Sequence, residues 1–184
     1  MTEQQEASED AVMTRIGQAV ILLHAGDREE ARNRLGEIWS EIGEEGDSLH
    51  RCTLAHYMAD AQDDPAEELA WDLRALTAAD GLGPAAAIPP TPGPGEGPPA
   101  HPAPHRAVRV FYPSLHLNLA ADYVKLRRPE AARVHLARAR EATGVLADDG
   151  YGYGSGVRAA IARLERRLAA EPGEGPHPFP EQHP

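Results

Sequence analysis

Apolar residues recur along this chain with the spacing that places side chains on one face of an α-helix. Three segments contain apolar residues at positions i, i+4 and i+7, and residues with this spacing share one side of a helix. These anchor residues are Ala31, Leu35 and Ile38, then Leu69, Leu73 and Leu76, and finally Ala132, Leu136 and Ala139. No stretch of alternating apolar and polar residues between hairpin turns competes with this pattern. The sequence therefore predicts an all-α protein.

Residues typical of helix ends divide the pattern into separate helices. Asp27 and Asp64 each precede a glutamate by three residues, as in a capping box. Gly26 suits the left-handed end of the helix before Asp27. We expect helices at residues 9–25, 28–43, 48–62, 65–79, 107–126, 129–143 and 153–170. Pro113 lies inside the fifth of these, so that helix either begins there or kinks there.

Proline and glycine mark the limits of the helical domain. Nine of the seventeen prolines lie at residues 82–105, and five lie at residues 171–184. Neither segment contains enough apolar residues to offset the entropy lost on ordering. We therefore expect one helical domain at residues 9–170, interrupted by a disordered insertion at 82–106. A disordered N-terminus (1–8) and a disordered tail (171–184) flank it.

The anchor residues fall in the second helices of three expected helical hairpins. The first helices contribute a small residue followed three residues later by a larger one. These pairs are Ala19 and Leu22, Ala55 and Met58, and Ala120 and Tyr123. The small residue precedes the first anchor by 12 residues in the outer hairpins and by 14 in the middle one. The matched spacing predicts a repeated hairpin, and an ordinary helical bundle with the same periodicity is the alternative.

The hairpins resemble the tetratricopeptide repeat (TPR) family, whose motif is a helix–turn–helix of about 34 residues. The third copy carries the family's positions at Leu119, Ala120, Tyr123, Ala132, Leu136 and Ala139. The family's tryptophan is missing from every copy, and Arg127 replaces its turn glycine in the third. The resemblance covers residues 11–79 and 107–143. It implies a right-handed superhelix of about three hairpins, with the last helix (residues 153–170) as a cap.

The resemblance also implies where a partner would bind. In the family, the first helices line a concave groove. Carried over residue by residue, the lining here would be Met13, Ile16, Val20, His24, Leu49, Cys52, His56, Asp60, Leu117, Asn118, Ala121 and Val124. A mixed apolar and polar surface suits an amphipathic helix or an extended peptide. We therefore expect a non-enzymatic adaptor that binds a protein or peptide and needs no cofactor.

One stripe within this lining has the residue types of a chemical site. Cys52, His56 and Asp60 are spaced i, i+4 and i+8, and a nucleophilic relay or, with His24, a metal site uses such residues. A nucleophile also needs an oxyanion donor, but the N–H groups near a mid-helix cysteine are committed to the helix. Groove lining is the interpretation we favour. The alternative function is a regulatory or sensor module that binds a small ligand or metal at this stripe.

Charge is divided unevenly along the chain. Residues 1–81 contain 19 acidic and 6 basic residues, whereas residues 106–170 contain 6 acidic and 12 basic ones. This division predicts contact between an acidic and a basic half, either within one molecule or between molecules. The arginines of the second half accompany no nucleic-acid reading motif, and the net charge is −11. The sequence therefore argues against nucleic-acid binding.

Three further features concern the compartment of the protein. A single cysteine excludes an intramolecular disulfide. No window approaches the ~18–20 apolar residues of a membrane span, and the acidic N-terminus lacks the features of a signal peptide. Seventeen arginines accompany one lysine, a usage typical of a high-GC bacterial genome. We expect a soluble, cytoplasmic protein.

Overall fold

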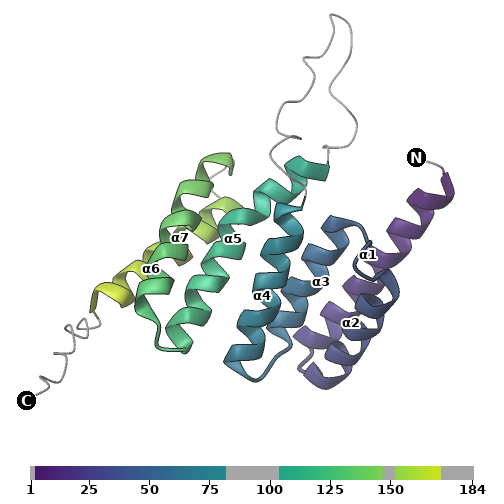
Figure 1. Ribbon diagram of the computed structural model, residues 1–184, viewed down its shortest axis with the longest axis horizontal. Helices are drawn as coiled ribbons and strands as arrows, with labels where there is room; N and C mark the ends of the chain where they lie inside the picture. The colour runs from purple at the N-terminus through teal and green to yellow at the C-terminus, as the bar shows by residue number, and fades with distance from the viewer. Residues whose placement is uncertain (1–2, 82–103, 147–151, 171–184) are drawn as a thin grey trace, which may run out of the picture.

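The computed structural model describes residues 3–81, 104–146 and 152–170 (Figure 1). These residues form helices and turns and contain no strand, which confirms the all-α prediction. The helices are α1 (Glu3–His24), α2 (Arg28–Ile42), α3 (Ser48–Asp60), α4 (Pro65–Asp80), α5 (Pro104–Lys125), α6 (Pro129–Ala142), the 3₁₀ turn η2 (Thr143–Val145) and α7 (Tyr153–Ala170). No helix in the described ranges is long and apolar enough to cross a bilayer.

Two helices begin earlier than the sequence predicts. α1 starts at Glu3, so residues 3–8 are helical where disorder was expected. α5 starts at Pro104 and continues through Pro113, which excludes a helix start at that proline, one of the two alternatives given above. The rest of the predicted insertion, residues 82–103, and the predicted tail at 171–184 lie outside the described residues.

Side-chain caps fix the starts of α2, α3 and α4. The Asp27 carboxylate accepts the backbone N–H of Glu30 at 3.3 Å, and Asp64 accepts that of Glu67 at 3.1 Å. Both capping residues were predicted from their spacing. Asp47 caps α3 in the same manner, although no glutamate follows it at the third position. Each cap satisfies N–H groups that the first helical turn leaves without an acceptor.

The turns inside the first and third hairpins share one backbone form. Gly26 and Arg127 both lie in the left-handed region, with φ of 91° and 57°. The N–H of Gly26 donates to the carbonyl of Leu23 at 3.1 Å, and that of Arg127 donates to the carbonyl of Val124 at 3.0 Å. The third hairpin therefore keeps the turn of the first without its glycine.

The helices pack as hairpins that follow one another in chain order (Figure 1). α1 pairs with α2, α3 with α4, and α5 with α6, while α7 packs on α6 and α5. The first helices also contact one another in succession, α1 with α3 and α3 with α5. As a result, the first and last hairpins lie at opposite ends of the array (Figure 1).

Three apolar clusters follow one another along this array. The first, around Leu35, joins α1 and α2 to α3. The second, around Ala75, joins α3, α4 and α5. The third, around Leu136, joins α5 and α6 to α7, and Ile161 of α7 is buried in it. Apolar burial of this kind is the main stabilising contribution to such a stack.

The sequence assigned the anchor residues wrongly in one helix of the repeat, α4. Those of α2 and α6 are buried as predicted. In α4, however, the buried residues are Asp72, Ala75 and Ala79, and Leu73 is 39% exposed. The residues of α4 that occupy the three anchor positions of the repeat are therefore Glu68, Asp72 and Ala75. Each lies one residue earlier in the chain than the leucine predicted for that position. The leucines misled the prediction because the position buried between hairpins is occupied by an acid.

Candidate functional site

Two carboxyl groups are buried between the second and third hairpins. Asp72 of α4 is 2% exposed and Asp122 of α5 is 1% exposed. In the repeat register, Asp72 takes the place that Leu35 holds in α2 and Leu136 holds in α6. Burial of a charged carboxylate is strongly unfavourable unless it is paired. The fold therefore departs from a plain apolar interface at this one position.

A lysine lies beside the two carboxyl groups. The Nζ atom of Lys125, the last residue of α5, donates to Glu68 Oε1 at 2.5 Å and to Asp122 Oδ1 at 3.3 Å. Lys125 is partly exposed, and Glu68 is mostly covered. The ammonium group of Lys125 thus links α4 and α5 beside the buried carboxyl groups of Asp72 and Asp122.

His56 of α3 closes the other side of this cluster. Its Nδ1 lies 3.2 Å from Asn118 Nδ2 and 3.9 Å from Asp72 Oδ1, and its Nε2 lies 3.9 Å from Asp60 Oδ2. With the imidazole neutral and its proton on Nε2, the Asn118 amide donates to Nδ1. We call the whole set the polar cluster. Its members are His56 and Asp60 of α3, Glu68 and Asp72 of α4, and Asn118, Asp122 and Lys125 of α5.

The polar cluster contains more acidic than basic side chains, and the pKa values of several of its members are raised. Burial, the charge of Asp72, the hydrogen bond with Asp72 and the charge of Glu68 together raise the pKa of Asp122 to about 8, against the opposing effect of Lys125. Burial also raises the pKa of Asp60. Burial lowers the pKa of His56, but Asp72 and Asp60 together raise it above its ordinary value. At neutral pH, a proton on Asp122 allows a hydrogen bond between the carboxyl groups of Asp122 and Asp72.

Two oxygen atoms of the cluster have no donor when both carboxyl groups are ionised. They are Asp72 Oδ1 and Asp122 Oδ2, and both are buried. Buried polar groups in proteins nearly always have a partner. The hydrogen-bond network of the polar cluster is therefore complete only while Asp122 holds its proton.

The structure divides the predicted groove residues into two groups. Three of them belong to the core, so their assignment to an open surface is wrong: Ile16, Cys52 and Val124 are 1%, 3% and 8% exposed. Each packs within one of the apolar clusters. The others remain at least partly accessible: Met13, Val20, His24, Leu49, His56, Asp60, Leu117, Asn118 and Ala121.

Cys52 does not belong with His56 and Asp60 chemically. Its thiol lies among Ala55, Ala75 and Leu115. Burial raises the pKa of Cys52 to about 12, with a contribution from the charge of Asp72. A thiol that stays protonated at neutral pH is a poor nucleophile. Among the described residues, no group of three or more His, Cys, Asp or Glu side chains is placed to hold a metal ion.

Sequence reasoning missed four members of the polar cluster: Glu68, Asp72, Asp122 and Lys125. Two signals were present. Asp122 interrupts the apolar residues in the first helix of the third hairpin, and Lys125 is the single lysine of the chain. Neither signal reveals a site alone, because the residues meet only once α3, α4 and α5 are packed.

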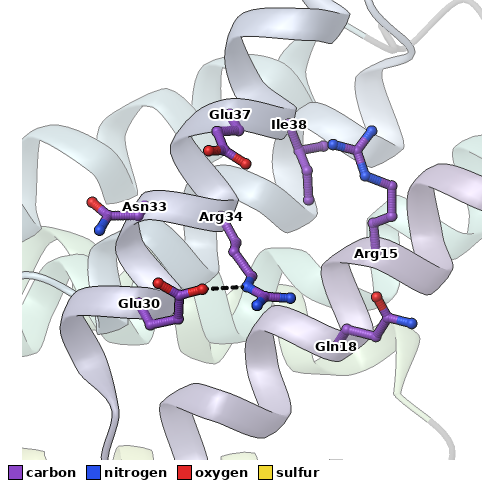
Figure 2. Close-up of a pocket in the computed structure, with 7 residues that line it drawn as sticks. All are labelled: Arg15, Gln18, Glu30, Asn33, Arg34, Glu37 and Ile38. Atoms are coloured by element: carbon purple, nitrogen blue, oxygen red, sulfur yellow. Dashed lines mark hydrogen bonds and ion pairs between the residues drawn. The ribbon is translucent and has the colours of Figure 1, made fainter.

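Crevices lie elsewhere, at the two ends of the array. One, of about 530 Å³, lies between α1 and α2 and is lined by Arg15, Gln18, Glu30, Asn33, Arg34, Glu37 and Ile38 (Figure 2). Its arginines already have partners, since Arg34 pairs with Glu30 at 2.7 Å and Arg15 pairs with Glu41. A second crevice, of about 420 Å³, lies between α6 and α7 and contains Arg133, Arg140 and Glu165. Neither crevice includes a member of the polar cluster.

Comparisons with known proteins find no counterpart. No family model, curated protein or solved structure matches this chain. Function is therefore inferred from the residues and their geometry.

Proposed function

We propose that this chain is a non-enzymatic interaction module of TPR-like type. It binds a segment of a partner protein along the face formed by the first helices α1, α3 and α5. A right-handed superhelix with this face on its concave side is part of the proposal. The successive packing of α1, α3 and α5 supports it.

The observation that carries the proposal is the contact between His56 of α3 and Asn118 of α5. Both residues are partly exposed, and they come from neighbouring hairpins. Their contact joins the accessible side chains of two first helices into one surface. A surface continuous across hairpins is what an extended or helical peptide requires.

The accessible residues of this face are chemically mixed. Met13 and Val20 supply apolar area at the α1 end, while His56 and Asp60 supply polar groups on α3. Apolar contacts give affinity and a few polar points fix register and orientation. We therefore expect a partner segment with both apolar and charged side chains.

The test begins with selection of about twelve-residue peptides from a random display library on the full chain. Affinities of the selected peptides are then measured by fluorescence anisotropy for two variants of the face, Met13→Lys on α1 and Asp60→Lys on α3. We expect each to weaken binding by about tenfold or more, equivalent to about 1.4 kcal/mol.

Matched control variants carry the same chemical changes on second helices. They are Val134→Lys on α6 and Glu67→Lys on α4, both at exposed positions. Binding should stay within about twofold of wild type for these, and helical circular dichroism should be unchanged for all four. Failure to select any peptide, or equal losses in the two pairs of variants, contradicts the proposal.

A further inference from the structure

The polar cluster already holds one ammonium group. Lys125 is the only lysine among 184 residues, and its Nζ lies between the carboxylates of Glu68 and Asp122. The intramolecular contact shows that the cluster accommodates the cationic end of a lysine side chain. Its chemistry is that of an acidic site for a cation.

Lys125 does not bond to every buried carboxylate oxygen of the cluster. Lys125 donates to Oδ1 of Asp122, whereas Oδ2 of Asp122 and Oδ1 of Asp72 are buried and have no donor once Asp122 loses its proton. An ammonium group has three donors and a guanidinium group has five. A cation that reached the inner pair would satisfy both oxygen atoms at once.

The outer members of the cluster are in contact with solvent. Asp60, His56 and Lys125 are each partly exposed. Lys125 stands at the end of α5 on a flexible side chain, which can move outward without disturbing the helix. An arriving cation meets the Asp60 and Glu68 carboxylates first and then replaces Lys125 over the buried pair.

We propose that the polar cluster is a binding site for one lysine or arginine side chain of the partner segment, and that Lys125 occupies this site in the free protein. The inference rests on the proposed function and names the chemistry of the partner at that face.

Binding of the cation should be linked to release of a proton. Burial, together with Asp72 and Glu68, raises the pKa of Asp122 to about 8, so its carboxyl group is protonated in the free protein at neutral pH. A cation placed between Asp122 and Asp72 favours the ionised form and displaces this proton. His56, on α3, acts in the same direction, because its raised pKa adds positive charge to the site as pH falls. Affinity for a cation should thus rise by about tenfold per pH unit up to the pKa of Asp122.

The test uses a small probe, so that it does not depend on a partner. The probe is Nα-acetyl-lysine methylamide, and its Nε-acetylated form is the neutral control. Both are titrated into the ¹⁵N-labelled full chain at pH 7 and followed by NMR. We expect the lysine probe to shift the amide signals of the polar cluster, including the Asn118 side-chain amide. The neutral form should leave them unchanged.

Variants of the cluster make the test specific. Lys125→Met removes the resident cation and should tighten probe binding by about tenfold, because an intramolecular competitor is lost. Arg133→Met, which removes a cation of α6 that pairs with Glu130 outside the cluster, should leave affinity unchanged. Asp122→Asn keeps the shape of the side chain, removes its charge and should abolish binding.

Each outcome decides the proposal. Equal shifts from the neutral probe, no shift in either wild type or Lys125→Met, or full binding by Asp122→Asn would overturn it. If Lys125→Met loses its helical circular dichroism, the comparison of wild type with Asp122→Asn decides alone. If display selects peptides that bind the face without any basic residue, the proposed function holds and this inference fails. If the probe binds but no peptide does, the cation site holds and the proposed function fails.

Discussion

Arg127 adopts a backbone conformation that suits glycine. Its φ of 57° lies in the left-handed region, as does the φ of 91° at Gly26 in the corresponding turn of the first hairpin. A side chain in this region crowds the carbonyl that follows, at a cost of about 1–2 kcal/mol, and glycine avoids the clash. Glycine loses part of this advantage because it is more flexible in the unfolded chain. The net effect should still favour glycine at position 127.

Arg127→Gly is therefore expected to raise the free energy of unfolding by about 0.5–1 kcal/mol, and the melting temperature by about 2–3 °C. Thermal unfolding followed by circular dichroism measures the change. The reverse replacement, Gly26→Arg, is the matched control and should destabilise the protein by a similar amount. A Cβ at Gly26 meets no atom within 4 Å, so the backbone conformation is the only cause there. A fall in melting temperature for Arg127→Gly contradicts this account.

Residue patterns predicted the local structure of this chain well. The caps at Asp27 and Asp64 and the left-handed end at Gly26 follow from short-range rules, because each involves residues adjacent in sequence. The sequence also identified Arg127 as the residue that replaces a turn glycine. Whether the turn would survive that replacement depends on packing of α5 against α6, which no local rule describes.

At the scale of helices, the interface between α4 and α5 is where prediction failed. Hydrophobicity selected Leu69, Leu73 and Leu76, whereas the interface buries Asp72 and packs it near Asp122. The leucine periodicity of α4 is real, but the facing helix determines which side of it is buried. Sequence periodicity defines a face of a helix and does not define its neighbour. The members of the polar cluster could not be grouped without that neighbour.

The raised pKa of Asp122 makes this interface sensitive to pH. Its pKa is about 8 in the folded protein and about 3.9 for an aspartate in an unfolded chain. Between these values the folded state binds more protons, so the contribution of Asp122 to stability is present at low pH and is lost as pH rises toward 8. We expect Asp122→Asn to remove this loss. The variant should therefore gain stability relative to wild type as the pH increases.

Urea unfolding at pH 5 and pH 8.5 measures this difference. Asp63→Asn is the control, because the pKa of the exposed Asp63 is lowered by its hydrogen bond with Arg32 and by the nearby Arg28. Loss of that carboxylate should lower the free energy of unfolding slightly and by the same amount at both pH values, because Asp63 is ionised throughout this range. If the stability of Asp122→Asn relative to wild type is the same at both pH values, the pKa of Asp122 is not raised in the folded protein.

At the scale of the whole molecule, the order of the hairpins separates the charges. The acidic first hairpin and the more basic α6 and α7 lie at opposite ends of the array (Figure 1). Direct contact between these ends within one molecule is therefore not available. Contact between the basic end of one molecule and the acidic end of another remains, and this head-to-tail contact can join more than two molecules into a ring or an open chain.

We therefore expect weak, salt-sensitive self-association. Sedimentation at about 20 mM salt should show a mass that rises with concentration above the 19.8 kDa of one chain. At about 0.5 M salt, screening should return it to that value. The variant Arg163→Glu with Arg166→Glu, on exposed positions of α7, should behave at low salt as wild type does at high salt. A mass independent of ionic strength contradicts the head-to-tail contact.

Asp72 occupies the position that leucine holds in the other two hairpins, and this has a consequence for how the molecule unfolds. In a linear stack each junction contributes separately, so the structure opens first where adjacent units adhere least. The junction between α4 and α5 is the broadest contact between successive hairpins, but its buried carboxyl groups lose the proton that Asp122 holds as the pH rises above about 8. Above that pH, the first four helices and the last three are thus expected to loosen as two blocks, and a partner that contacts both would hold them together.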